Sequence, residues 1–179
     1  MSDAEVKPIA LIGLMGAGKS VVARALGARL HGRVEDLDHR IEAGAGSTVA
    51  EIFALEGESG FRLRETAALE AALAAAPAVI ACGGGVVLDP GNRTELRERC
   101  RTVWLEVAPA IAARRVAAHS AVRPLLGPGP LEARLEALLR ERAPLYESVA
   151  AARVDSGDDP PESIAERVLA GLAAAREVR

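Results

Sequence analysis

The sequence predicts an α/β fold, a three-layer sandwich in which a central parallel sheet of about five strands carries helices on both faces. Short apolar runs alternate with helical segments along the whole chain, which is the pattern of a parallel sheet. The first run leads into a glycine-rich loop and then into a helix, as in a parallel strand–helix unit. The 179 residues suit one domain, and we find neither an internal repeat nor an inter-domain linker.

The first part of the chain provides two of the expected strands. Residues 9–12 are an uninterrupted apolar run, which is typical of a strand buried on both faces. Residues 20–30 place apolar side chains on one helical face and arginines off it. Residues 33–36 lead into a second strand, which ends at Asp36. Further helices are expected at residues 38–43, at 48–55 after a Ser47 cap, and at 58–75.

The second part continues the alternation. Residues 78–81 form a buried strand after a turn at Pro77, and a triple glycine follows it. Asp89 is a capping residue type, and Pro90 suits the first turn of a helix that runs to about residue 99. The remaining elements are a strand at 102–107, a helix at 109–116, a mobile Gly/Pro-rich loop at 117–130, a helix at 131–142, a strand at 152–155 and a closing helix at 162–174.

Residues 13–20 read G-x-x-x-x-G-K-S, the phosphate-binding loop known as Walker A. Its glycines let successive backbone N–H groups point inward at a polyphosphate, and the following helix directs its positive N-terminal end to the same place. Lys19 supplies a mobile charge for the β- and γ-phosphates, and Ser20 offers a hydroxyl to Mg²⁺. Lys7 and Lys19 are the only lysines of this arginine-rich chain, which favours nucleotide binding over a plain glycine turn.

Composition excludes several classes of protein. A net charge of −3 and only two Phe, one Trp and one Tyr provide no basic or stacking surface, so we expect no nucleic-acid partner. Residues 71–88 carry no charge, but Pro77 and glycines interrupt them, so we expect no membrane span. Cys82 and Cys100 suit free thiols in a reducing cytoplasm, and residues 1–8 lack the apolar core of a signal peptide. We therefore expect a cytoplasmic protein.

Several short motifs follow one another along the chain. Three of them come directly after expected strands, where the ligands of parallel sheets bind. They are GLMGAGKS at residues 13–20, DLD at 36–38, S-T-V-A-E-I-F at 47–53, E-G-E-x-G-F-R at 56–62, GGG at 83–85, R-P-L-L at 123–126 and E-R-A-P-L-Y at 141–146. Through this set the chain resembles the shikimate kinase family over nearly its whole length.

The resemblance implies a P-loop kinase fold in a single domain, residues 1–179, with a substrate-binding helical segment at about 38–64 and a mobile lid at about 116–128. It implies ATP-dependent phosphorylation of the 3-hydroxyl of shikimate to shikimate 3-phosphate. This step belongs to the route through chorismate to the aromatic amino acids. Mg²⁺ is the implied cofactor, ATP and shikimate are the implied partners, and we expect a monomer.

The resemblance also implies roles for individual residues. ATP is held by Gly13, Gly16, Ala17, Gly18, Lys19, Ser20 and Val21, with Arg115 and Pro161 beside adenine and Arg123 reaching the transferring phosphoryl group from the lid. Mg²⁺ is held by Ser20 and, through water, by Asp36. Shikimate is held by Asp38, Arg62, Gly84, Gly85 and Arg142. Lys19, Asp38 and Arg123 are the implied catalytic residues.

The side chains concerned suit these roles physically. The planar fork of an arginine pairs with both oxygens of a carboxylate, as the acid group of shikimate requires of Arg62 and Arg142. The alternative for both is an ordinary salt bridge on a helix surface. Asp38 is either a general base or a group that only positions the hydroxyl. Asp36 is alternatively a helix cap, and Cys82 stands where the family more often has a small hydroxyl residue or glycine, which weakens a role in Mg²⁺ binding at that position.

Other functions remain open at this point. A gluconate kinase or a nucleoside monophosphate kinase would share the phosphate-binding loop. A nucleotide acceptor usually needs side-chain amides, whereas the chain has no Gln and the single Asn92. A GTP-dependent switch is a more distant alternative, because it needs an N-K-x-D motif and commonly a water-orienting Gln, both of which the sequence lacks.

Overall fold

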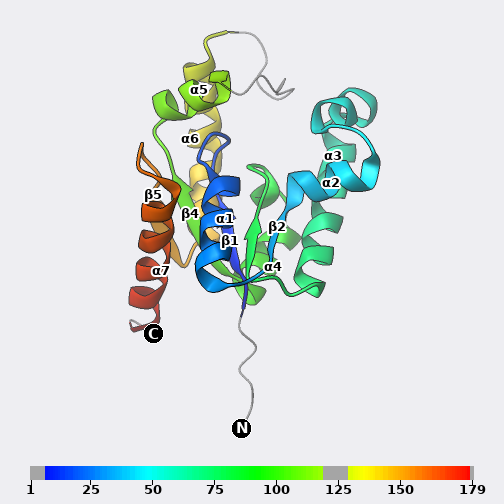
Figure 1. Ribbon diagram of the computed structural model, residues 1–179. Coiled ribbons are helices and arrows are strands. Elements are labelled where there is room, and N and C mark those ends of the chain that lie inside the picture. Colours follow the sequence, from blue (N-terminus) through cyan, green and yellow to red (C-terminus); the bar gives the residue numbers. More distant parts are fainter. Residues whose placement is uncertain (1–6, 119–128, 178–179) are drawn as a thin grey trace.

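The computed structural model describes residues 7–118 and 129–177 (Figure 1). Its strands are β1 (Ile9–Ile12), β2 (Val34–Asp36), β3 (Val79–Ala81), β4 (Arg101–Glu106) and β5 (Ala152–Asp155). They form one parallel sheet in the order β2-β3-β1-β4-β5. The helices are α1 (Lys19–Leu30), α2 (Leu37–Ala45), α3 (Val49–Ala74), η1 (Val86–Leu88), α4 (Pro90–Arg99), α5 (Pro109–Ala118), α6 (Leu131–Val149) and α7 (Pro161–Glu177). The expected fold class is confirmed.

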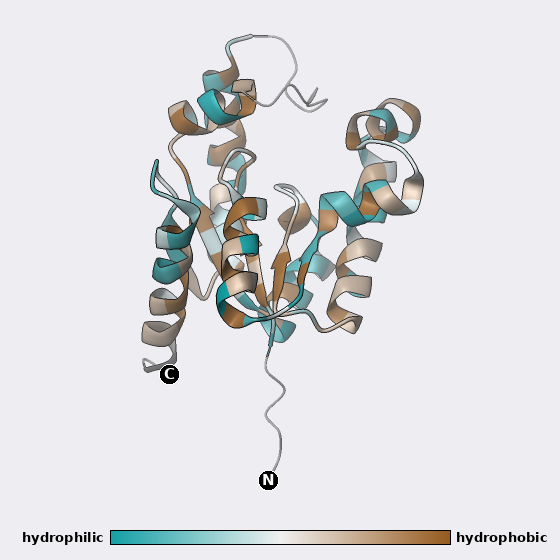
Figure 2. Ribbon diagram, viewed as in Figure 1, coloured by the Kyte–Doolittle hydropathy of each residue, from teal (hydrophilic) through white to brown (hydrophobic). Residues whose placement is uncertain are grey.

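The alternation of side chains along the strands divides the core into two layers. Ile9 and Leu11 of β1 pack in the layer that contains α1 and α7, whereas Ala10 and Ile12 pack in the layer that contains α3 and α4. Both layers are apolar because both faces of a parallel sheet are covered. Figure 2 shows the strands as a largely hydrophobic centre, with hydrophilic residues spread over the outer helices.

The strand order determines which loops meet. β1 lies between β3 and β4, with Leu11 opposite Ala81 on one side and Val103 on the other. All strands point the same way, so the loops that follow β1 and β3 leave the sheet side by side. This arrangement brings the phosphate-binding loop next to the triple glycine.

Helix α3 differs from the expected pair of helices. The predicted segments at 48–55 and 58–75 are parts of one element, which Gly57 kinks with φ 69° and ψ −175°. This backbone conformation suits glycine, because a side chain is disfavoured at positive φ. The expected cap at Ser47 is wrong by one residue. Thr48 accepts from the Glu51 N–H, and the Glu51 side chain accepts from the Thr48 N–H, so both orphan donors are satisfied in a capping box.

Other parts of the chain also differ from the sequence prediction. Helix α6 continues past residue 142 to Val149 although Pro144 lies inside it, and a short 3₁₀ helix, η1, follows the triple glycine. Of the predicted lid at about 116–128, residues 116–118 belong to α5 and the others lie outside the described residues. Within residues 7–118 and 129–177, no helix combines the length and apolar character that a bilayer span needs.

The capping box of α3 gives a first prediction. Thr48→Ala removes the side-chain acceptor of the cap, and we expect a loss of about 1 kcal/mol in the free energy of unfolding. Thr48→Ser keeps the hydroxyl and is the matched control, which should stay within a few tenths of the wild-type value, on the order of 0.3 kcal/mol. Urea denaturation of the three proteins measures this. Equal stability of Thr48→Ala and the wild type would contradict the cap.

Candidate active site

The phosphate-binding loop has the backbone that its glycines predict. Gly13, Gly16 and Gly18 have φ values of 139°, 81° and 81°. At Gly16 an added Cβ would lie 2.8 Å from the carbonyl oxygen of Ala112, so no larger residue fits. Lys19 begins α1 and folds back over the loop, where its Nζ donates to the carbonyls of Gly13 (2.9 Å) and Leu14 (3.0 Å). The ammonium group therefore lies against the loop, at the position where the loop would bind a polyphosphate.

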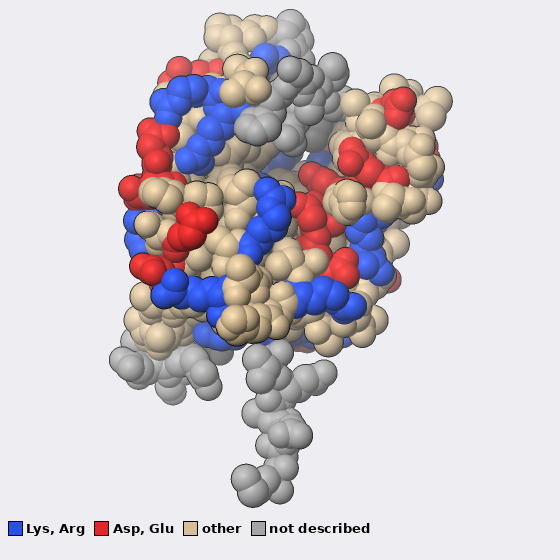
Figure 3. All heavy atoms as spheres, viewed as in Figure 1, with Lys and Arg blue, Asp and Glu red and all other residues tan. Residues whose placement is uncertain are grey.

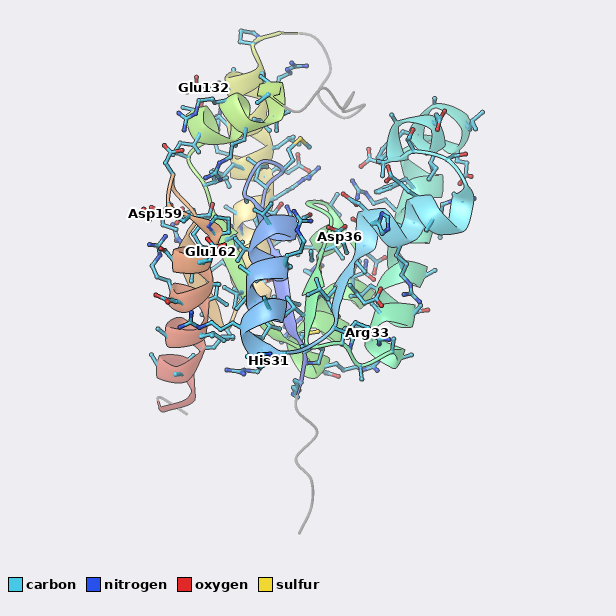
Figure 4. All side chains as sticks on the ribbon, in the orientation of Figure 1. His31, Arg33, Asp36, Glu132, Asp159 and Glu162 are labelled. Carbon is cyan, nitrogen blue, oxygen red and sulfur yellow. The ribbon has the colours of Figure 1, made fainter. Side chains whose placement is uncertain are left out.

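Ser20 and Asp36 face each other across the ends of α1 and β2. The Ser20 hydroxyl donates to Asp36 Oδ2 at 2.5 Å, and Oδ1 accepts from the backbone N–H of His39 at 3.3 Å. Asp36 is therefore the N-cap of α2, as the alternative interpretation held, and it also contacts Ser20. Figure 4 shows Asp36 between the start of α1 and the start of α2, far from His31 and Arg33 at the other end of α1.

This pair suits a hard cation. A hydroxyl and a carboxylate are oxygen ligands of the kind that Mg²⁺ prefers, and Mg²⁺ bound with a nucleotide takes most of its ligands from phosphates and water. Among the described residues there is no group of three or more His, Cys, Asp or Glu side chains that would form a protein-only metal site. The donor set fits a cation that is shared with a bound nucleotide.

Arg62 and Arg142 lie on either side of the triple glycine. An added Cβ at Gly85 would overlap the Arg62 guanidinium, and one at Gly84 would lie 3.7 Å from Arg142 Nη1. Arg142 is 3% exposed and donates through Nη1 to the Gly84 carbonyl at 3.2 Å. Arg62 is an ion-pair partner of Glu65 (2.6 Å) and Glu58 (3.2 Å) on its own helix. The alternative of a helix-surface residue is thus wrong for Arg142, because that side chain is buried.

Glu65 is a site residue that the sequence analysis missed. Its side chain is 1% exposed. Its Oε2 atom forms an ion pair with Arg62, and its Oε1 atom is buried without a hydrogen-bond partner among the described residues. An added Cβ at Gly83 would collide with Glu65 and lie 3.3 Å from Asp38 Oδ1, so both carboxylates border the glycine loop. Burial raises the pKa of Glu65, against the lowering effect of Arg62. Its spacing of three residues from Arg62 on a helix was the available signal.

The sequence analysis also missed an apolar wall of this site. Phe53 and Phe61 stack with their ring centroids 4.5 Å apart, and the Arg62 guanidinium lies 5.4 Å from the centre of the Phe61 ring. Val49 extends this wall. Such a surface suits the carbon face of a small ring, whereas the charged groups around it suit that ring's polar substituents.

These groups line one cleft of about 360 Å³, whose mouth is hollowed between the α2–α3 side and the rest of the molecule (Figure 3). The cleft brings together most of the predicted residues: Gly16, Gly18, Lys19, Ser20, Val21, Asp36, Asp38, Arg62, Gly84, Gly85, Arg115 and Arg142. Of the other predicted residues, Gly13 and Ala17 belong to the phosphate-binding loop without lining the cleft, and Pro161 begins α7. Arg123 lies outside the described residues.

Two lining residues need separate comment. Arg115 reaches from α5 to the carbonyls of Gly16 (3.0 Å) and Ser156 (3.2 Å), so it connects the phosphate-binding loop to the segment after β5. Cys82 is buried, and burial raises the pKa of its thiol well above the usual range. The Cys82 side chain is therefore a small uncharged group at the floor of the cleft.

The comparisons with known proteins agree with this geometry. A family model described as Shikimate kinase matches residues 15–173. A shikimate kinase of Thermobifida fusca is 46% identical over 170 residues, which cover 94% of this chain and 97% of that protein. A solved structure of the Acinetobacter baumannii shikimate kinase in complex with shikimate superposes with a TM-score of 0.90 at 34% identity, covering 97% and 96% of the two chains. A gluconokinase of Sinorhizobium meliloti, 20% identical with a TM-score of 0.62 and 97% and 96% coverage, shares the fold alone.

The burial of Glu65 predicts a pH-dependent stability. The unfolded chain releases this proton near the ordinary value of 4.5, whereas the folded protein, with its raised pKa, still holds it. This contribution makes the wild-type free energy of unfolding fall as pH rises above about 4.5. Glu65→Gln has no proton to lose, so its stability relative to the wild type should rise over the same range and then level off. Urea denaturation of both proteins across the range measures this, and a constant difference would contradict the raised pKa.

Proposed function

The chain belongs to the shikimate kinase family, and from that premise we propose that its cleft transfers the γ-phosphoryl group of ATP to the 3-hydroxyl of shikimate. The observation that carries the proposal is that one cleft holds a phosphate-binding loop together with two arginines that flank a glycine loop. The first arrangement suits a polyphosphate donor and the second suits an acceptor with a carboxylate. The product is shikimate 3-phosphate, an intermediate of aromatic amino-acid biosynthesis.

The donor end of the cleft is formed by residues 13–20. Backbone N–H groups of the loop and the N-terminus of α1 attract the β- and γ-phosphates, and Lys19 exchanges its contacts with Gly13 and Leu14 for contacts with these oxygens. Ser20 and Asp36 would hold Mg²⁺, which would neutralise charge on the phosphates when bound. We propose that Arg115 and Pro161 border the adenine ring, since Arg115 already contacts the segment after β5.

The acceptor end is formed by α2, α3, the glycine loop and α6. The carboxylate of shikimate lies between Arg62 and Arg142, which bind it by charge-assisted hydrogen bonds. The carbon face of its ring packs on Phe53 and Phe61. This orientation fixes the far side of the ring, with its hydroxyls, towards Asp38 and the phosphate-binding loop.

Asp38 acts on the attacking hydroxyl. Its carboxylate accepts a hydrogen bond from that group and orients the oxygen lone pair towards the γ-phosphorus. It takes up the proton as the new P–O bond forms and the bond from the γ-phosphorus to the β–γ bridging oxygen breaks, which releases ADP. Because phosphoryl transfer has a loose transition state, we assign the larger effect to positioning.

The roles of Arg123 and of the predicted lid, the monomeric state and the cytoplasmic location remain predictions from the sequence.

An ADP-release assay with a panel of acceptors tests the proposed function. With shikimate, quinate, gluconate and dehydroshikimate as acceptors, we expect kcat/KM for shikimate to exceed that for gluconate by about a hundredfold or more, because gluconate leaves paired groups of the site unsatisfied. Lys19→Ala is the control for background ATP hydrolysis and should lose at least about a hundredfold in turnover. A preference for gluconate would contradict the proposed acceptor but not the assignment of the phosphate-binding loop.

A further inference from the structure

We propose that Tyr146 is a positioning residue for the acceptor site, because its buried hydroxyl fixes the carbonyl of Gly84 and so holds the glycine loop in place between Arg142 and Arg62. The inference rests on the proposed function, in which this loop and both arginines bind shikimate. Tyr146 lies too deep to touch the substrate itself, since it is fully buried and does not line the cleft.

Two donors from one helix converge on the Gly84 carbonyl. Tyr146 Oη donates to it at 2.5 Å and Arg142 Nη1 donates to it at 3.2 Å. The two side chains are four residues apart on α6, so they project from the same face of that helix. A carbonyl oxygen has two lone pairs, and both are used here. The hydroxyl therefore fixes the same peptide that orients Arg142.

The orientation of this peptide has a consequence for the loop. The described residues contain no cis peptide bond, so the N–H of Gly85 points opposite to the carbonyl of Gly84 and away from α6. The neighbouring carbonyls are also occupied, because Gly83 accepts from the Val86 N–H (3.2 Å) and Gly85 accepts from the Leu88 N–H (2.9 Å) in η1. Of these four hydrogen bonds to the glycine loop, the one from Tyr146 is the shortest, and the bonds from Tyr146 and Arg142 are the two that tie the loop to α6.

The tyrosine ring is itself held firmly. Trp104 of β4 packs against it with ring centroids 5.7 Å apart, and Arg153 lies 4.6 Å from the centre of the Trp104 ring. The ring is thus held against the central sheet, and this packing fixes the position of the hydroxyl group. Burial raises the pKa of Tyr146 to about 12, which keeps the hydroxyl protonated and able to donate at neutral pH.

Tyr146→Phe removes the hydroxyl and keeps the ring. Thr102→Val is the matched control, because Thr102 is also buried and donates its hydroxyl to a backbone carbonyl, that of Leu96, at 2.7 Å, without lining the cleft. We expect both variants to lose thermal stability. Only Tyr146→Phe should raise KM for shikimate, by about three- to thirtyfold, with kcat within about threefold of the wild type and KM for ATP unchanged. Wild-type KM for shikimate in Tyr146→Phe, or an equal change in both KM values, would overturn the inference.

A second measurement separates this inference from the proposed function. Amide hydrogen exchange of the substrate-free protein reports the hydrogen bonds of Val86 and Leu88 to the glycine loop. We expect these amides to exchange faster in Tyr146→Phe and at the wild-type rate in Thr102→Val. Unchanged exchange in Tyr146→Phe would overturn the positioning role. If the wild type fails to phosphorylate shikimate while the exchange result holds, only the proposed acceptor is wrong.

Discussion

The parallel pairing of β1 with β3 is the constraint on which the site depends. It places the loop that follows β1 against the triple glycine that follows β3, so that an added Cβ at Gly84 would lie 3.3 Å from the Gly13 carbonyl and 3.5 Å from the Met15 nitrogen. A side chain at this position would crowd the Gly13 carbonyl, so glycine suits the close approach of the two loops. The contact joins the phosphate-binding loop to the glycine loop, which lies beside Arg62 and Arg142.

Charge is then distributed around this contact. In the proposed function the triphosphate and the carboxylate acceptor are both anions, and such a reaction needs positive charge at two separate places in the cleft. Lys19 and the N-terminus of α1 supply one of them, and Arg62 and Arg142 supply the other. The carboxylates of Asp38 and Glu65 lie between and beside these cations. Glu65 orients Arg62 through a 2.6 Å ion pair, and burial raises the pKa of its carboxyl group against the lowering effect of Arg62.

Most of the fold was predictable from local pattern, and the missed parts depend on distant contacts. Apolar runs identified the strands because both faces of a parallel sheet are buried, and the Walker A spacing identified the phosphate-binding loop. Thr48 was missed as the cap because Ser47 is an equally suitable residue type. Glu65 gave only the weak signal of its helical spacing from Arg62, and Tyr146 appeared only as the last residue of a motif, since the position of each beside the glycine loop depends on a contact between distant parts of the chain. The strand order likewise depends on long-range pairing.

The central claim is that the carboxylate of the acceptor is recognised by the planar fork of Arg62 together with Arg142, and one measurement tests it directly. Steady-state kinetics with shikimate and with its methyl ester, on the wild type and on Arg62→Lys, form a double-substitution cycle. We predict that the ester lowers kcat/KM of the wild type by about tenfold to a hundredfold, and that the same change has a much smaller effect in Arg62→Lys, where the second parallel hydrogen bond is already lost. Equal rates with acid and ester in the wild type, or equal penalties in both proteins, would contradict the account.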